Sequence, residues 1–137
     1  MRKSPTIFPA ASLLPTPSGP PPSALTELAA RRGLTLGRSD ALRLLRAEQA
    51  ALEDTGRLLL DGGVLPPLLE AFADSPYLTG DPAQTLAELT ALFYHLKSET
   101  DDRVPDERLL RAMRRRFDEP CRGSVERLTD LLSEGRL

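Results

Sequence analysis

Apolar residues recur along most of this chain at the three- and four-residue spacing that places them on one face of a helix. In the clearest stretch the successive spacings are three, four and three residues (Leu86, Leu89, Phe93, Leu96). Repeated along the chain, the pattern predicts helices over residues 24–32, 40–55, 64–73, 82 to about 98–100, 106–117 and 125–133. We therefore expect an all-α protein, a compact single-domain bundle of about six short helices joined by short loops.

Residues that start or stop helices support these boundaries. Asp81, Pro82 and Gln84 form an Asp-x-x-Gln variant of the capping box, in which Gln84 is expected to bond back to the cap residue. Proline is tolerated in a first helical turn, and glycine favours the left-handed conformation that ends a helix. The segment 57–60, an arginine followed by three leucines, is too short to assign, and it is compatible with a short strand or a buried turn.

Prolines are concentrated at the N-terminus. The chain has 13 prolines, and seven of them precede Ser23 (Pro5, Pro9, Pro15, Pro17, Pro20, Pro21, Pro22). Because proline fixes φ and removes a backbone donor, residues 1–22 are expected to form a flexible, disordered tail, and residues 23–137 a helical domain. The tail is either passive or, through its PxxP spacing, a recognition segment.

Composition and charge narrow the classes of protein. The chain has 137 residues, of which 28% are charged and 40% hydrophobic, and a net charge of −2, so it lacks the strongly basic balance of most nucleic-acid-binding domains. Cys121 is the single cysteine, which excludes an intrachain disulfide and favours a reducing compartment. No apolar run is long enough for a membrane helix, and prolines interrupt any leader-like segment, so we expect a cytoplasmic protein.

Carboxylates cluster between the fourth and fifth expected helices (Glu99, Asp101, Asp102, Asp106, Glu107). Such groups can hold Ca²⁺ or Mg²⁺, but the spacing does not match a calcium-binding loop. Asp106 and Glu107 also suit a helix N-terminus, where negative charge is favourable. We therefore expect no metal and no cofactor.

The fifth expected helix is rich in arginine over residues 108–116. Arg108, Arg111 and Arg115 fall on one face, opposite the apolar stripe. They form a solvated, salt-bridged face, a surface for a protein partner or, as the alternative function, a surface for nucleic-acid phosphates. Helix-turn-helix signals and interleaved aromatic residues are missing, so a protein partner or self-association is expected before nucleic acid.

His95 and Cys121 are the two residues that suggest nucleophilic catalysis. No Asn or Asp is placed to complete a triad, and isolated buried cysteines are mostly inert. His95 lies one residue off the apolar stripe, at its boundary. The expectation is a protein without catalytic activity.

Three segments between residues 93 and 124 resemble a bacterial family of small proteins known only as a domain of unknown function. They are a Phe-Tyr-x-x-Lys-x-Glu pattern at 93–99, an acidic helix start at Asp106, and a Cys-x-Gly-Ser segment at 121–124. Upstream, the chain matches the family's Gly-Arg, Gly-Gly and Phe-x-Asp-Ser-Pro-Tyr segments at 56–57, 62–63 and 72–77. Ser98 stands where the family pattern has Asn. The resemblance covers residues 33–132 and implies one module, with no activity, substrate, cofactor or catalytic residue to carry over.

These observations favour a small intracellular interaction or regulatory module that binds a partner through a helix face. The candidate partner-binding residues are Tyr77, Arg108, Arg111 and Arg115. Tyr77 is included because its loop, residues 74–77, has no evident role in the core; the other interpretation is a capped turn in which Tyr77 covers the edge of the core.

Overall fold

The computed structural model describes residues 20–59 and 62–133, and this part of the chain contains helices and no strand. The six helices are α1 (Pro22–Arg31), α2 (Arg38–Asp54), α3 (Leu65–Phe72), α4 (Pro82–Glu99), α5 (Asp106–Asp118) and α6 (Val125–Ser133). The expected all-α bundle of about six helices is confirmed. The expected tail, residues 1–22, lies outside the described residues except for its last three prolines, and Pro22 is the first residue of α1.

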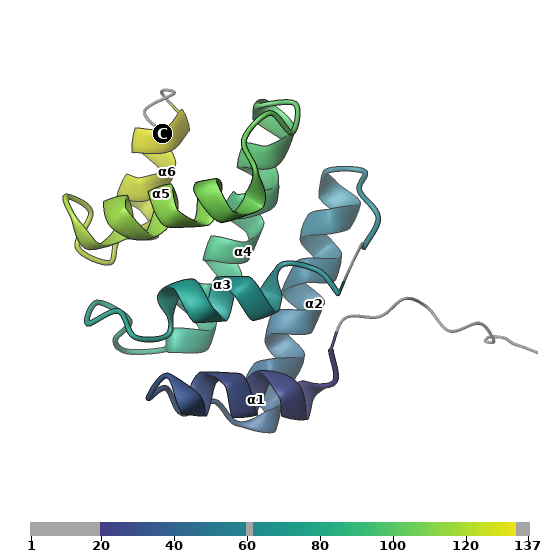
Figure 1. Ribbon diagram of the computed structural model, residues 1–137, viewed down its shortest axis with the longest axis vertical. Coiled ribbons are helices and arrows are strands. Elements are labelled where there is room, and N and C mark those ends of the chain that lie inside the picture. The colour runs from purple at the N-terminus through teal and green to yellow at the C-terminus, as the bar shows by residue number, and fades with distance from the viewer. Residues whose placement is uncertain (1–19, 60–61, 134–137) are drawn as a thin grey trace, which may run out of the picture.

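The helices form two crossing sets. Figure 1 shows α1, α3 and α5 lying across the view, one above the other, while α2, α4 and α6 run more nearly upright. α4 is the central helix, because it packs on α2, α3 and α6, and the α2–α4 contact is the most extensive in the fold. α3 lies between α1 and α5 and contacts both.

The predicted apolar stripes form one continuous core. The four α4 residues that define the pattern are at most 1% exposed, and they meet Leu44 and Leu52 of α2 in the same cluster. Phe72 of α3 and Phe117 of α5 pack edge to face, with ring centroids 5.4 Å apart. This contact between aromatic rings fixes α5 alongside α3 and leaves the opposite face of α5 in solvent.

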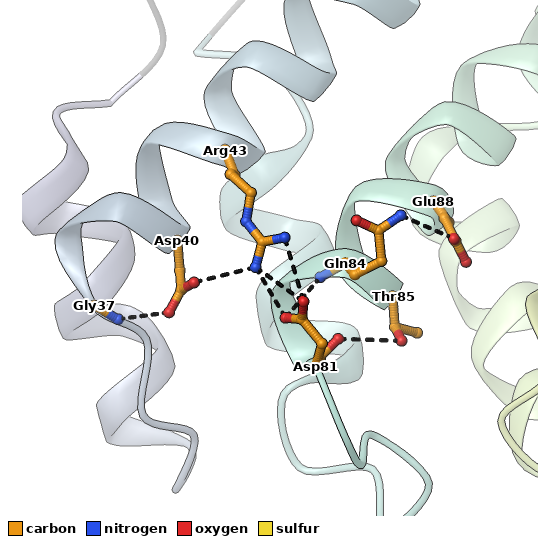
Figure 2. Close-up of polar contacts among 7 residues, drawn as sticks. All are labelled: Gly37, Asp40, Arg43, Asp81, Gln84, Thr85 and Glu88. Atoms are coloured by element: carbon orange, nitrogen blue, oxygen red, sulfur yellow. Dashed lines mark hydrogen bonds and ion pairs between the residues drawn. The ribbon is translucent and has the colours of Figure 1, made fainter.

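One carboxylate, that of Asp81, holds the start of α4. Asp81 is the N-cap and its carboxylate accepts the Gln84 N–H at 3.3 Å, as predicted. The prediction that the Gln84 side chain bonds back to the cap residue is wrong. Its amide group donates to the Glu88 carboxylate instead, as Figure 2 shows. Asp81 also pairs with Arg43 of α2 at 2.9 Å, and this hydrogen-bonded guanidinium lowers the pKa of the Asp81 carboxyl below its usual value. One carboxylate therefore caps α4 and ties it to α2.

Two local expectations need correction. α1 and α2 each begin two residues before the predicted start, and the expected strand or buried turn at 57–60 is not found in residues 57–59. Leu58 is 82% exposed, whereas Leu59 is partly buried against the core. None of the described helices has the length and apolar character needed to cross a membrane.

Candidate functional site

Three arginines lie along the solvent face of α5. The helix buries Leu109, Met113 and Phe117 completely, and its 3.6-residue period therefore turns positions 108, 111 and 115 outward. Arg108, Arg111 and Arg115 are all exposed, as the sequence predicted. We call these three residues the arginine stripe.

The arginine stripe carries no ion pair with any described residue. The expected salt-bridged face is therefore not formed by residues 108, 111 and 115. The contrast is Arg114 on the same helix, which pairs with both Asp74 and Asp118. Three guanidinium groups on one face remain available to carboxylates or phosphates from outside the described chain.

A groove runs between α3 and α5 beside the stripe. It has a volume of about 540 Å³, and its charged rim includes Arg111. The apolar lining comes from both helices (Pro66, Pro67, Ala71, Leu110). A second hollow of about 270 Å³ lies on the other side and contains all three arginines together with Val104 and Ala112. Because Arg111 lines both, the arginine stripe and this α3–α5 groove form one continuous surface.

Charge changes sign along α5. Asp106 and Glu107 occupy its first turn, and Arg115 and Arg116 its last, which matches the helix dipole at both ends. Asp106 is already paired, because Lys97 of α4 lies 2.8 Å from its Oδ1 atom. The positive part of the surface therefore begins at Arg108 and continues through the C-terminal half of α5.

Arg114 fastens the loop after α3 to α5. Its Nη1 donates to the Ala71 carbonyl at 2.6 Å and to Asp74 Oδ1 at 2.7 Å, while its Nε donates to Asp118 at 2.8 Å. The hydrogen bond from Arg114 lowers the pKa of the Asp74 carboxyl below its usual value. The Ser75 hydroxyl completes the connection by donating to Asp118 Oδ1 at 2.7 Å. This loop has a fixed geometry relative to the helix that carries the arginine stripe.

Tyr77, the fourth candidate partner-binding residue, is half-buried and packs against the core. A Cβ atom on Gly123 would lie 2.9 Å from the Tyr77 Cβ atom, so the two segments are in close contact. The loop is further held by the Tyr77 N–H, which donates to the Ser75 hydroxyl. Tyr77 thus covers the edge of the core, as the alternative interpretation of its loop proposed.

The sequence analysis missed a buried polar cluster around Glu48. Glu48 of α2 is 2% exposed, and its Oε2 accepts hydrogen bonds from the Tyr94 hydroxyl at 2.7 Å and the Val64 N–H at 2.8 Å. Burial, together with the hydrogen bond to Glu48, raises the pKa of Tyr94 far above its usual value. The available signal was the position of Glu48 on the apolar stripe of α2, one helical turn after Leu44.

Cys121 and His95 have unlike environments. Cys121 is 3% exposed, and burial raises the pKa of its thiol, which disfavours the thiolate that nucleophilic chemistry requires. His95 is exposed rather than at the boundary of the core, and its Nε2 lies 3.2 Å from Glu99. No hydrogen bond joins Cys121 to His95 within the described residues.

Each aspartate between α4 and α5 forms its shortest ion pair with a different cation. Asp101 pairs with Arg103, Asp102 with Arg57, and Asp106 with Lys97. Among residues 20–59 and 62–133, no three His, Cys, Asp or Glu side chains are grouped for a metal ion.

The sequence motifs that carried the family resemblance come together in two places. The Asp-Ser-Pro-Tyr loop packs on the Cys-x-Gly-Ser segment through Tyr77 and Gly123. The Gly-Gly segment meets α4 at the Glu48 cluster, where a Cβ atom on Gly63 would lie 2.5 Å from the Glu48 carboxylate that Tyr94 contacts. Both are packing contacts between elements distant in sequence.

Comparison with known proteins identifies a family and no function. The model of a family of unknown function (DUF6323) matches residues 23–135. No curated protein and no solved structure matches the chain.

Proposed function

Since the chain belongs to the family of unknown function DUF6323, we propose from its geometry that it is a small interaction module without catalytic activity. It binds an acidic protein segment through the arginine stripe of α5. The observation that carries the proposal is that Arg108, Arg111 and Arg115 are exposed on one helix face and have no ion pair within the described chain.

Charge complementarity and the neighbouring groove support an acidic protein segment as the partner. Asp or Glu side chains at helical or extended spacing would pair with the stripe, and guanidinium–carboxylate pairs are among the stronger polar contacts. The α3–α5 groove adds an apolar lining around Pro66, Pro67 and Leu110, which suits an aliphatic side chain of the same segment. Glu107 at the start of α5 repels acidic residues there, so the acidic part of the partner aligns with the C-terminal half of the helix.

A different protein fits this surface better than a second copy of the chain. A two-fold symmetric dimer brings the same patch of both copies together. Two arginine stripes in contact would place like charges against one another, which is unfavourable. Self-association through α5 is therefore disfavoured on electrostatic grounds.

Nucleic acid is the alternative ligand for the same arginines. Against it stands the apolar lining of the adjoining groove, around Pro66, Pro67 and Leu110, which offers nothing to a phosphate backbone. The described aromatic rings also favour the core over base stacking, because Phe72, Phe93, Tyr94 and Phe117 are buried and Tyr77 is half-buried against the core.

We further propose a cytoplasmic location, and this and the lack of catalytic activity are supported by the state of two side chains, Cys121 and His95. The buried Cys121 has a raised thiol pKa, and the exposed His95 lies against Glu99. The single cysteine is a free thiol, which suits the reducing cytoplasm.

Fluorescence anisotropy with two labelled probes tests the proposal. The first probe is a peptide of interspersed glutamate and leucine, and the second is a duplex DNA of similar net charge. The native chain should bind the peptide more tightly, and the Arg111→Glu/Arg115→Glu variant should lose that binding. A matched control is Arg38→Glu/Arg46→Glu, which makes the same charge change at two exposed positions of α2.

The control variant should bind the peptide as the native chain does, since its changes lie on another helix. Preference for the DNA, with affinity falling steeply as salt rises, would favour the nucleic-acid function instead. Equal binding of the peptide by both double variants would contradict a role for the stripe.

A further inference from the structure

A third pocket lies where the C-terminal half of α4 meets the start of α3. It has a volume of about 490 Å³, within the range of small-molecule sites. One side is apolar (Leu58, Val64, Pro66, Pro67, Phe93) and the other is charged (Arg57, Lys97, Asp102, Asp106). The arginine stripe does not line it, although Pro66, Pro67 and Asp106 border both this pocket and the α3–α5 groove.

Lys97 is a buried cation with spare donor capacity. Its residue is 8% exposed. Its Nζ donates to the Val104 carbonyl at 2.8 Å and lies 2.8 Å from Asp106 Oδ1. An ammonium group has three N–H donors, and the next carboxylate oxygen, on Asp102, is 3.8 Å away, too far for a hydrogen bond. One donor therefore remains for an oxygen atom from outside the described chain.

Arg57 adds a second cation to the same pocket. Its Nη2 donates to Asp102 Oδ1 at 2.5 Å, and its Nε has a long contact of 3.4 Å with the Ser98 hydroxyl. No hydrogen bond to a described residue involves its Nη1 atom. Two cations of this pocket thus have donors available to an additional carboxylate.

Each of the two aspartates in this pocket also has one carboxylate oxygen without a described donor. Asp102 and Asp106 contact the two cations through Oδ1, and no described residue donates to either Oδ2. Asp101 and Asp102 have φ values of 51° and 60°, a left-handed conformation that is uncommon for residues other than glycine. The Asp102 N–H donates to the Lys97 carbonyl at 2.9 Å, so this conformation belongs to the turn that ends α4.

The balance of charge selects the class of ligand. Two cations and two carboxylates give this pocket no net charge, so a simple anion is repelled by the aspartates and a simple cation by Lys97 and Arg57. A zwitterion avoids both penalties by placing its carboxylate at the cations and its ammonium group at the aspartates. We propose that this pocket binds a small zwitterion with an apolar side chain, of which a free aliphatic α-amino acid is the simplest example.

Three probes related by single deletions test the proposal on the full chain. They are leucine, 4-methylpentanoate, which lacks the amine, and 3-methylbutylamine, which lacks the carboxylate. Binding is followed through the backbone amide shifts of residues 57–59, 62–67 and 93–106. Leucine should bind at least about tenfold more tightly than either deletion probe, since each loses one charge-assisted contact.

Variants of each half of the pocket assign the contacts. Arg57→Gln should remove the preference for leucine over 3-methylbutylamine, and Asp102→Asn the preference for leucine over 4-methylpentanoate. Arg103→Gln and Asp101→Asn are matched controls, because these neighbouring residues are exposed, pair with each other and do not line the pocket. Both controls should bind leucine as the native chain does.

Three results would overturn the proposal. They are the absence of shifts at these residues up to the solubility limit of leucine, equal affinity for all three probes, and tighter binding of 4-methylpentanoate than of leucine. Unchanged leucine binding in both Arg57→Gln and Asp102→Asn would place the ligand elsewhere. Failure here leaves the acidic-peptide experiment unaffected, since that experiment reports on Arg111 and Arg115.

Discussion

The Tyr94 hydroxyl donates a hydrogen bond to Glu48 Oε2 across 2.7 Å, inside the α2–α4 contact. The same oxygen accepts the N–H of Val64, the residue that precedes the first turn of α3. A buried carboxylate is costly unless donors surround it, so both bonds compensate for removing Glu48 from water. Three parts of the chain are thereby joined at one atom.

Removing the Tyr94 hydroxyl should destabilise the fold. In Tyr94→Phe the Glu48 carboxylate loses one of its two described donors while staying buried, which costs about 1–3 kcal/mol of unfolding free energy. Urea unfolding measures the loss. Tyr77→Phe is the control: no described residue bonds its hydroxyl, so its change should stay within about 0.5 kcal/mol. Equal losses in the two variants would contradict the role assigned to Glu48.

Gly63 should tolerate a methyl group less well than its neighbour Gly62. Both have positive φ, 79° and 81°, so alanine incurs a similar backbone penalty of about 1–2 kcal/mol at either position. Only at Gly63 would the Cβ atom also meet the Glu48 carboxylate, at 2.5 and 2.8 Å, while nothing lies within 4 Å at Gly62. In thermal unfolding, the melting temperature of Gly63→Ala should therefore be well below that of Gly62→Ala. The reverse order would be inconsistent with the close approach to Glu48.

The same comparison is available at Gly123. Gly123 and Gly33 share a φ of 87°, but a Cβ atom at Gly123 would lie 2.9 Å from both Cβ and the carbonyl oxygen of Tyr77, and at Gly33 nothing lies within 4 Å. We expect Gly123→Ala to lose at least about 1 kcal/mol more stability than Gly33→Ala, in line with overpacking costs. Similar melting temperatures for the two variants would mean that the Tyr77 loop moves freely away from residue 123.

Protonation of Asp74 should account for part of the loss of folding stability at acidic pH. The hydrogen bond from Arg114 lowers the folded-state pKa of Asp74 below 3.8. On acidification the unfolded chain therefore takes up this proton first, so the stabilisation is present above about pH 4 and is lost as the pH falls further. Asp74→Asn should lose less stability between pH 5 and 3 than the native chain, by chemical unfolding at each pH.

The control for this measurement is Asp54→Asn, at an exposed residue without an ion pair in the described chain. Its loss of stability between the two pH values should match that of the native chain. If Asp74→Asn also matches the native chain, the contact with Arg114 does not contribute to acid stability.

The helical architecture could be predicted because it depends on local patterns. The apolar periodicity of residues 86–96, the cap at Asp81 and the prolines at helix starts all act within one or two turns. The arginine stripe was predictable for the same reason, since helical geometry alone places Arg108, Arg111 and Arg115 on one face.

Contacts between distant segments were not predictable from such patterns. Nothing local relates Glu48 to Tyr94, separated by 46 positions, or Arg57 to Asp102, separated by 45. The sequence left two interpretations of Tyr77 open, because its packing on Gly123 depends on how the segment after α5 returns to the loop after α3. A charged residue on an apolar stripe, as at Glu48, was the one sequence signal of such a contact.

The most direct test of the account is a quantitative capture experiment from the native host with three immobilised proteins. These are the native chain, Arg111→Glu/Arg115→Glu, and the charge-matched control Arg38→Glu/Arg46→Glu. The account predicts a protein with an acidic segment that the native chain and the control retain equally and the α5 variant loses. Retention of the same proteins by all three, or recovery of nucleic acid alone, would contradict it.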